Sequence, residues 1–165
     1  GYVVGIATGA AESSRSRIWP IENFARLADK LVETKKARIV FVGADYEAVQ
    51  IEKIRGMMKL ESASAAGKLN LKETIALITR CSLFISNDTG PMHIAAAQGV
   101  KTIGLFGPNL PERFGPYGKG NVGIYKANCS FSPCINVHYG QTPNCYLKEN
   151  ICMKSITVED VLRQV

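Results

Sequence analysis

The sequence predicts an α/β domain with a parallel sheet covered by helices on both faces, and three observations support this. Short apolar segments rich in β-branched residues alternate with segments of helical periodicity along most of the chain. Polar or glycine-rich loops follow the apolar segments. The length of 165 residues, with 46% hydrophobic and 21% charged residues, suits a single domain with a proper core. Such alternation is typical of a doubly wound sheet.

Apolar spacing predicts the elements of the first third of the chain. The runs 2–8 and 38–43 predict buried strands, separated by a polar loop up to Arg17. A helix over about 20–36, begun by Pro20, follows from apolar residues at i, i+3, i+4, i+7 and i+8, namely Phe24, Leu27, Ala28, Leu31 and Val32. A second helix is expected over roughly 46–58, with core contacts from Val49, Ile51, Ile54 and Met58.

The rest of the chain continues the alternation and then becomes irregular. We expect, in order, a short edge strand within 61–67, a helix from about 71 to 80, a strand at 83–85, a helix of small residues after Pro91, strands at 101–106 and 122–126, an irregular cysteine-containing segment at 128–154, and a capped helix at 157–165.

The stretch from Ile85 to Ala97 organises the prediction. An apolar strand runs into a polar turn and then into an alanine-rich helix, which Asp88 or Thr89 can cap. The first N–H groups of such a helix and the positive end of its dipole face the same point, so the turn can bind an anion. An ordinary capped helix is the alternative interpretation.

Polar loops follow all five of the strands expected before residue 107, and the carboxyl ends of parallel strands share one edge of the sheet. In doubly wound sheets ligands bind in a crevice outside that edge. Loops at the opposite edge are polar as well, but the unusual residues fall at the carboxyl ends. These loops are Thr8 to Arg17, Gly43-Ala44-Asp45, Lys68-Leu69, Asn87 to His93, and Gly107-Pro108-Asn109.

Several function classes are excluded by missing motifs. Gly5-Ile6-Ala7-Thr8-Gly9 does not supply the dinucleotide fingerprint G-x-G-x-x-G, and Ala66-Gly67-Lys68-Leu69 does not form a phosphate loop. No G-x-S-x-G nucleophile elbow occurs. A nucleotide or phosphate crevice without hydride-transfer, ATPase or serine-hydrolase chemistry remains.

The net charge of +6 favours an anionic ligand or surface. The basic residues are scattered over helices without interleaved aromatic residues, so no nucleic-acid partner is expected. No secretion signal opens the chain, and no apolar run reaches the roughly 20 residues that cross a bilayer. The chain starts at Gly1 directly in a strand-like run, so we expect it to be excised from a longer protein that has a substantial N-terminal part.

Three motifs, in order and with fitting spacings, resemble those of glycosyltransferase family 9, the ADP-heptose:lipopolysaccharide heptosyltransferases. They are Asp88-Thr89-Gly90-Pro91-Met92-His93-Ile94-Ala95-Ala96-Ala97, Gly104-Leu105-Phe106-Gly107-Pro108, and Gly115-Pro116-Tyr117-Gly118. Arg17-Ile18-Trp19-Pro20 and Lys68-Leu69-Asn70-Leu71 resemble two further family elements. The resemblance implies a Rossmann-like doubly wound sheet over residues 1–165, the C-terminal, nucleotide-sugar-binding half of a GT-B fold. The N-terminal acceptor domain would be absent.

The resemblance also implies roles for the turn at 88–93. Thr89 and Gly90 would hold the donor's diphosphate, and Asp88 would accept from hydroxyls of the sugar, because a carboxylate beside a diphosphate is repelled. His93 would donate to a phosphate oxygen. A helix histidine bonded to a neighbouring loop is the alternative for His93.

Other implied roles fall on the remaining loops. Arg17 takes the place of a basic residue, usually Lys, that stabilises the departing diphosphate, and Thr8 would add a hydroxyl. Asp45, or failing it Glu47, would accept from the ribose, although either can instead cap the next helix. Leu69 would meet the adenine; a plain loop hydrophobe is its alternative.

The implied activity is inverting transfer of heptose from ADP-heptose to the lipopolysaccharide inner core, at the cytoplasmic face of the inner membrane, with peripheral membrane association. No cofactor is expected beyond the ADP-sugar substrate. The general base would lie in the absent domain, so this chain alone should bind donor weakly and transfer nothing. The alternatives are a relative that uses another nucleotide sugar, a GT-B-like sugar epimerase, and a non-catalytic nucleotide-binding or assembly module.

Five cysteines fall into two groups. Cys81 precedes a strand and is expected to be a buried filler. Cys129, Cys134, Cys145 and Cys152 are separated by four, ten and six residues, which is looser than the CxxC pairs of a zinc site. Reduced structural thiols, a metal site and disulfides all remain open, with His138 as an additional ligand or a surface loop residue.

Overall fold

The computed structural model describes residues 1–126, 128–135 and 144–165. Within these residues six strands form one sheet in the order β3-β2-β1-β4-β5-β6, and every neighbouring pair is parallel. The strands are β1 (Val3–Ala7), β2 (Arg38–Val42), β3 (Ala63–Ser64), β4 (Leu83–Asn87), β5 (Thr102–Phe106) and β6 (Val122–Tyr125). The predicted doubly wound parallel sheet is confirmed.

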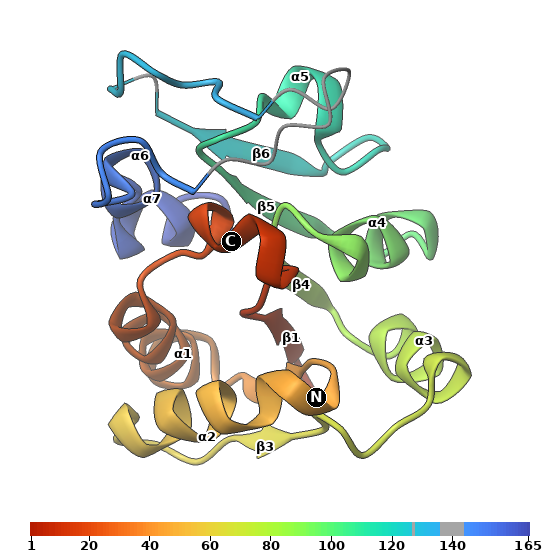
Figure 1. Ribbon diagram of the computed structural model, residues 1–165. Helices are drawn as coiled ribbons and strands as arrows, with labels where there is room; N and C mark the ends of the chain where they lie inside the picture. The colour runs from red at the N-terminus through yellow and green to blue at the C-terminus, as the bar shows by residue number, and fades with distance from the viewer. Residues whose placement is uncertain (127, 136–143) are drawn as a thin grey trace.

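Helices cover both faces of this sheet. In Figure 1, α1, α2, α6 and α7 lie on the left side of the sheet, and α3 and α4 lie on the right. The helical segments are η1 (Glu12–Arg17), α1 (Ile21–Lys35), η2 (Asp45–Glu47), α2 (Ala48–Met57), α3 (Leu71–Thr79), α4 (Gly90–Ala97), α5 (Pro111–Phe114), α6 (Ile151–Lys154) and α7 (Val158–Leu162). Among the described residues, no helix is both long enough and apolar enough to cross a lipid bilayer.

Two apolar clusters hold the layers together. The larger one joins the sheet to α1, α2, α6 and α7 and contains Phe24, Leu27, Ile54 and Met153, among others. The smaller one joins the other face to α3 and α4. Because both faces are covered, β4 and β5 are buried along their whole length.

The chain leaves the middle of the sheet in two directions, and this positions the crevice. From β1 it proceeds outward to β2 and β3, and then crosses to β4 on the other side of β1. Ala7 at the end of β1 pairs with Val42 of β2 and with Ser86 of β4. Thr8 and Asn87 therefore stand side by side at the switch point, where doubly wound sheets bind ligands.

The second helix differs in part from expectation. It starts with the short turn η2, and Val49, expected in the core, is 83% exposed. Ile51 and Ile54 are fully buried, as expected. At about 100° per residue, Val49 lies roughly 200° from Ile51 and so faces away from the sheet. Counting an apolar residue without checking its angular position caused this error.

Two loop expectations also need refinement. The polar loop before Arg17 contains the 3₁₀ segment η1, which bends at Ser14. The segment expected to be irregular at 128–154 ends in the short helix α6, whereas its described residues at 128–135 and 144–150 form neither helix nor strand. The final helix α7 is capped as predicted, because Thr157 accepts from the backbone N–H of Asp160.

Candidate functional site

Asn87 joins three segments at the switch point. Its buried side chain donates from Nδ2 to the carbonyls of Thr8 (2.9 Å) and Gly9 (3.2 Å), and its Oδ1 accepts from the backbone N–H of Trp19 (3.2 Å). The end of β4 is thereby bonded to both ends of the loop that follows β1. No role was predicted for Asn87 from the sequence, although two polar residues, Ser86 and Asn87, end an otherwise apolar and fully buried strand.

Trp19 anchors the far end of the same loop. Its indole is fully buried, donates from Nε1 to the carbonyl of Ile156 (2.9 Å), and packs edge-on against Phe24 with ring centroids 4.9 Å apart. A buried indole with its N–H satisfied is a rigid fixture. Because Arg17 lies only two residues before Trp19, the fixed indole restricts where Arg17 can lie.

Arg17 lies against Asp88 at the edge of the crevice. Nη1 of Arg17 donates to the backbone carbonyl of Asp88 (3.2 Å) and lies 3.7 Å from Oδ2 of its carboxylate. Their side chains are 20% and 6% exposed. The pair is partly desolvated and places the guanidinium of Arg17 at the start of α4. An anionic ligand bound there could accept charge-assisted hydrogen bonds from it.

The N-terminus of α4 has no side-chain cap, contrary to expectation. Thr89 occupies the capping position, but its Oγ1 donates to the carbonyl of Asn87 (3.3 Å) and lies 3.2 Å from Oγ of Ser86. Asp88 is turned instead toward Arg17 and Asn109. The first N–H groups of α4 therefore lack a side-chain acceptor. A Cβ on Gly90 would meet no atom within 4 Å, so there is open space beside the helix start.

Three buried side-chain atoms at this edge lack a hydrogen-bond partner. They are Oγ1 of Thr8, Nε of Arg17 and Oδ1 of Asn109, and within the described ranges no other buried side-chain polar atom is unpaired. A buried polar atom without a partner costs about 1–3 kcal/mol. Thr8 follows β1, Asn109 is in the loop that follows β5, and Arg17 belongs to the loop between β1 and α1. This concentration marks a place built to hold a polar ligand.

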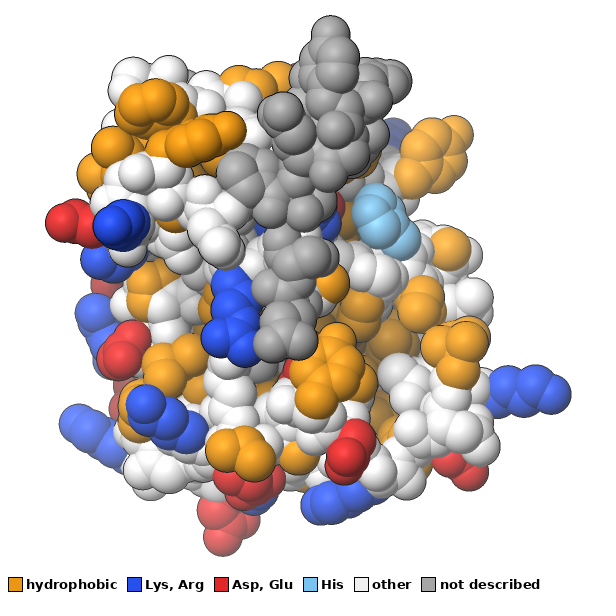
Figure 2. Space-filling model, in the orientation of Figure 1, with side chains coloured by type: hydrophobic (Ala, Val, Ile, Leu, Met, Phe, Trp, Pro, Cys, Tyr) orange, Lys and Arg blue, Asp and Glu red, His pale blue; other side chains and the backbone are white. Residues whose placement is uncertain are grey.

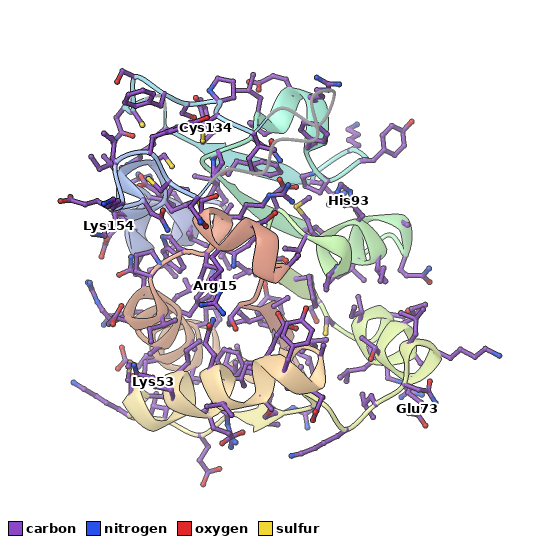
Figure 3. All side chains as sticks on the ribbon, in the orientation of Figure 1. Arg15, Lys53, Glu73, His93, Cys134 and Lys154 are labelled. Atoms are coloured by element: carbon purple, nitrogen blue, oxygen red, sulfur yellow. The ribbon has the colours of Figure 1, made fainter. Side chains whose placement is uncertain are left out.

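Two adjoining pockets border η1, η2 and the start of α4. They share Gly9, Ala10, Tyr46 and Glu47, so they form one groove. The first, of about 260 Å³, is completed by Ala7, Ala11, Arg17, Thr89, Gly90 and Pro91, and the second, of about 300 Å³, by Arg15, Ile18 and Gln50. Each is close to the size of a small-molecule site. Arg15, labelled in Figure 3, reaches the second pocket from η1.

Glu47 lies in both pockets and touches two loops. Its Oε2 accepts from the backbone N–H of Ala44 (2.6 Å), and a Cβ on Gly9 would lie only 1.3 Å from Oε1. Gly9 thus leaves the space that the carboxylate fills. Burial raises the pKa of Glu47, although the bond from Ala44 opposes this shift. Of the two acids proposed for the ribose, Glu47 is the one that lines the groove. Its Oε2, through the bond from Ala44, also caps the start of η2, as the alternative interpretation expected.

Five predicted residues do not line the two pockets: Thr8 and Asp88 are buried directly beside them, and three others lie farther away. Asp45 is exposed and lies beside Gly67. Leu69, in the loop before α3, is 37% exposed. His93 projects from the first turn of α4 to the surface, where it is the pale blue side chain in Figure 2 and is labelled in Figure 3. The structure therefore brings together Thr8, Arg17, Glu47, Asp88, Thr89 and Gly90, and leaves Asp45, Leu69 and His93 at its periphery.

The four clustered cysteines line one small cavity between the loops at 129–134 and 145–152. Figure 3 shows Cys134 near β6 and α6. Their thiols are free, and burial raises the pKa of Cys134 and brings that of Cys152 to about 11. Across the described residues, no three Cys, His, Asp or Glu side chains are grouped to hold a metal ion. His138 lies outside the described residues.

Cys81 is the buried filler that the sequence predicted. It is 7% exposed and belongs to the smaller cluster, close to Gly5. Burial raises the pKa of this thiol to about 11, so it is not a nucleophile at neutral pH.

The profile of glycosyltransferase family 9 (heptosyltransferase) matches residues 2–141, which is most of the chain. The chain belongs to this family. Lipooligosaccharide heptosyltransferase 2 of Campylobacter jejuni is 29% identical over 164 residues, covering 98% of this chain and 49% of that protein. This member of family 9 therefore spans about half the length of that relative.

Solved structures agree on the fold. The E. coli ADP-heptose lps heptosyltransferase II superposes with a TM-score of 0.80 at 23% identity, over 99% of this chain and 45% of that one. The E. coli heptosyltransferase WaaC with ADP gives a TM-score of 0.72 at 19% identity, over 98% of this chain and 42% of that one. At these identities the likeness establishes the Rossmann-like architecture alone.

Proposed function

We propose that residues 1–165 form the donor-binding domain of an inverting heptosyltransferase, the C-terminal half of a GT-B enzyme. The enzyme would transfer heptose from ADP-heptose to the lipopolysaccharide inner core. One observation carries the proposal: in a chain of glycosyltransferase family 9, every unpaired buried side-chain polar atom of the described residues lies at the same strand-end edge as an uncapped helix N-terminus.

The names of the structural neighbours support the donor. One is named an ADP-heptose lps heptosyltransferase, and another was solved with ADP. A nucleoside diphosphate suits the groove described above, because it needs cationic and N–H donors at its centre and an acceptor for its ribose. The basic excess of the chain favours the same ligand class.

The diphosphate would lie over β1 and β4. Nε of Arg17 and Oγ1 of Thr8 are unpaired there, and the N–H groups that open α4 at Gly90 have no side-chain acceptor. These donors would stabilise the negative charge that grows on the leaving diphosphate during transfer. Arg in place of Lys keeps the charge and offers a fork of N–H groups.

The two ends of the donor would be read by carboxylates. Glu47, which lines the groove, is the better candidate for the ribose hydroxyls than the exposed Asp45. Asp88 would accept from the sugar, since Arg17 already offsets part of its charge. We also propose that Leu69 contacts the adenine and that His93 donates to a phosphate. Both residues lie outside the two pockets, so these contacts require that the ligand extend beyond the pockets or that the loops move toward it.

The transfer itself needs a second domain. A general base must deprotonate the acceptor hydroxyl, and we place it in an N-terminal acceptor domain. The present chain would then bind ADP-heptose weakly and transfer no sugar, without a metal cofactor or a nucleic-acid partner. The complete enzyme would work in the cytoplasm at the inner face of the inner membrane, where the lipopolysaccharide acceptor is held.

Calorimetry with ADP, UDP and GDP tests the proposal. We expect ADP to bind tightest, because the donor is ADP-heptose. Tighter binding of UDP or GDP would point to another nucleotide sugar, and no binding of any of the three would point to a non-catalytic assembly module. A transfer assay on the chain alone is the complementary test. Measurable heptose transfer would contradict the proposal that the general base lies in another domain.

A further inference from the structure

Asn109 has no role in the site as proposed so far, yet it is 3% exposed and lies within the crevice edge. It follows β5 in the loop that opens with Gly107 and Pro108. Most side-chain hydrogen bonds in proteins go to backbone groups or to water. The amide of Asn109 instead bonds to a side chain, that of Asp88.

The amide is committed to a single partner. Its Nδ2 donates to Oδ2 of Asp88, and its Oδ1 is buried without a partner. Among the described residues its side chain bonds to no backbone group, so it does not hold its own loop in shape. A carboxylate only accepts, which fixes the orientation of the amide: the NH₂ group must face Asp88.

The carboxylate of Asp88 is therefore held from two sides by different means. Arg17 supplies charge, with Nη1 at 3.7 Å from Oδ2, and Asn109 supplies a neutral hydrogen bond to the same oxygen. A second cation would neutralise the carboxylate and weaken it as an acceptor. A neutral amide orients it and leaves it able to accept from a hydroxyl.

The position of Asn109 along the sheet assigns it to one end of the donor. Glu47 follows β2, Thr8 follows β1, and Asn109 follows β5, which is three strand spacings from β2. At about 4.8 Å per spacing this is roughly 14 Å. If Glu47 meets the ribose and Arg17 the diphosphate, Asn109 lies at the far end, where the transferred sugar begins.

We propose that Asn109 is a positioning residue that sets the specificity of the domain for the donor sugar. It orients the Asp88 carboxylate toward sugar hydroxyls and takes no part in holding the nucleotide diphosphate. The inference rests on the proposed function, because it assumes a nucleotide sugar in the groove.

The test compares ADP with ADP-heptose on the same protein. Calorimetry on the wild-type chain gives the ratio of the two dissociation constants, which we expect to favour ADP-heptose. Asn109→Ala should reduce that ratio by about 3- to 10-fold, the value of one hydrogen bond, while the affinity for ADP stays unchanged. Asn121→Ala is the matched control, since its amide bonds to the backbone N–H of Thr102 at the opposite edge of the sheet and should leave the ratio intact.

Asn109→Asp gives a second readout without a cavity. Two adjacent carboxylates repel, so the ratio should fall at neutral pH and recover at mildly acid pH, when one of them takes up a proton and can donate. A merely structural asparagine would not produce this pH profile. The Asp variant also serves if the Ala variant fails to fold, as judged by its thermal transition.

Each outcome has one meaning. Equal loss of ADP and ADP-heptose affinity in both variants would make Asn109 structural and overturn the inference, as would an unchanged ratio or a wild-type ratio of one. ADP binding tighter than UDP binding would still support the proposed function in all those cases. If the wild type binds no adenine nucleotide, the proposed function itself fails.

Discussion

Two buried aspartates in this molecule have similar partners and opposite surroundings. Asp88 at the crevice is 5% exposed and faces Arg17, and Asp160 in α7 is 8% exposed and contacts Lys126 and Arg163. Asp160 also accepts from the backbone N–H of Thr157 (2.8 Å), so its needs are met within the chain. Next to Asp88, Arg17 and Asn109 each retain an unpaired atom. Charge pairing alone therefore does not distinguish a site from a structural contact, whereas unpaired atoms do.

The pKa values of Asp160 and of Glu47 in the groove show the same difference between a structural contact and a candidate site. Burial acts to raise the pKa of Asp160, but hydrogen bonds from Lys126 and Thr157 outweigh it and bring the value to about 2. Burial raises the pKa of Glu47, and only the N–H of Ala44 opposes it. The structural carboxyl is stabilised as an anion by its own chain, and the carboxyl in the groove is not. Such displaced groups cluster at functional sites.

Replacing each aspartate's arginine should give the largest contrast. Arg17→Ala removes a charge-assisted phosphate contact, so ADP should bind about 1.5–3 kcal/mol more weakly in calorimetry. Arg163→Ala, which removes the exposed partner of Asp160, should leave ADP affinity unchanged. An unaltered ADP affinity in Arg17→Ala would show that the cation at this edge does not contact the nucleotide.

Removing Asp160 should have the converse effect. Asp160→Ala deprives the Thr157 N–H of its acceptor and breaks two ion pairs, so the free energy of unfolding should fall by about 1–2 kcal/mol. Chemical denaturation measures this loss. Under conditions in which the variant is fully folded, its affinity for ADP should equal that of the wild type. A loss of ADP affinity would mean that α7 contributes to the groove, against the division drawn above.

Glu47 allows a pH test of the groove. As the pH falls through the raised pKa of Glu47, its carboxylate becomes protonated and accepts less strongly from the ribose, so ADP affinity should decline. Glu47→Gln should lack this component and bind about 0.5–1.5 kcal/mol more weakly at neutral pH. Protonation of the ADP phosphates affects both proteins equally, so the difference between their pH profiles reports Glu47. Parallel profiles would exclude it from the site.

The smallest expected effect is on the free energy of unfolding at acid pH. The pKa of Asp160 is lower in the folded state, at about 2, than its ordinary value of 3.8. Its contribution is therefore fully present above the ordinary value and is lost as the pH falls from there through the folded value. Between pH 3.8 and about 2 the free energy of unfolding should therefore fall more steeply in the wild type than in Asp160→Asn, and the variant, which lacks this contribution, should unfold at a higher pH when acid unfolding is followed by circular dichroism. Identical acid profiles would contradict it.

The sheet was predictable because burial on both faces leaves a direct imprint on the sequence. Apolar runs identified the central strands β1, β2, β4 and β5, since parallel strands covered by helices bury both faces, whereas the short edge strand β3 left only a weak signal. Val49 was wrongly expected in the core because its angular position, roughly 200° from the buried Ile51 on the helix, places it on the solvent side. Apolar character alone did not show this, whereas residue spacing does.

The site was predictable to the level of loops and less so to the level of atoms. The turn at 88–90, Arg17, Thr8 and Glu47 lie at one edge because topology brings strand ends together. The choice of Glu47 over Asp45 depends on the space left by Gly9, a residue from another loop. Asn109 depends likewise on Asp88, which is 21 residues away. Contacts between loops arise only in the folded chain, so no spacing rule could reveal them.

The Trp19 anchor has a consequence for how this domain tolerates changes in length. Arg17 is located from the side of α1, through the indole bonded to Ile156 and the backbone bonded to Asn87. Changes in the length of the loop between Gly9 and Arg17 should therefore shift the guanidinium less than loss of either bond. Conversely, a truncation before Ile156, far from any ligand, would untether it.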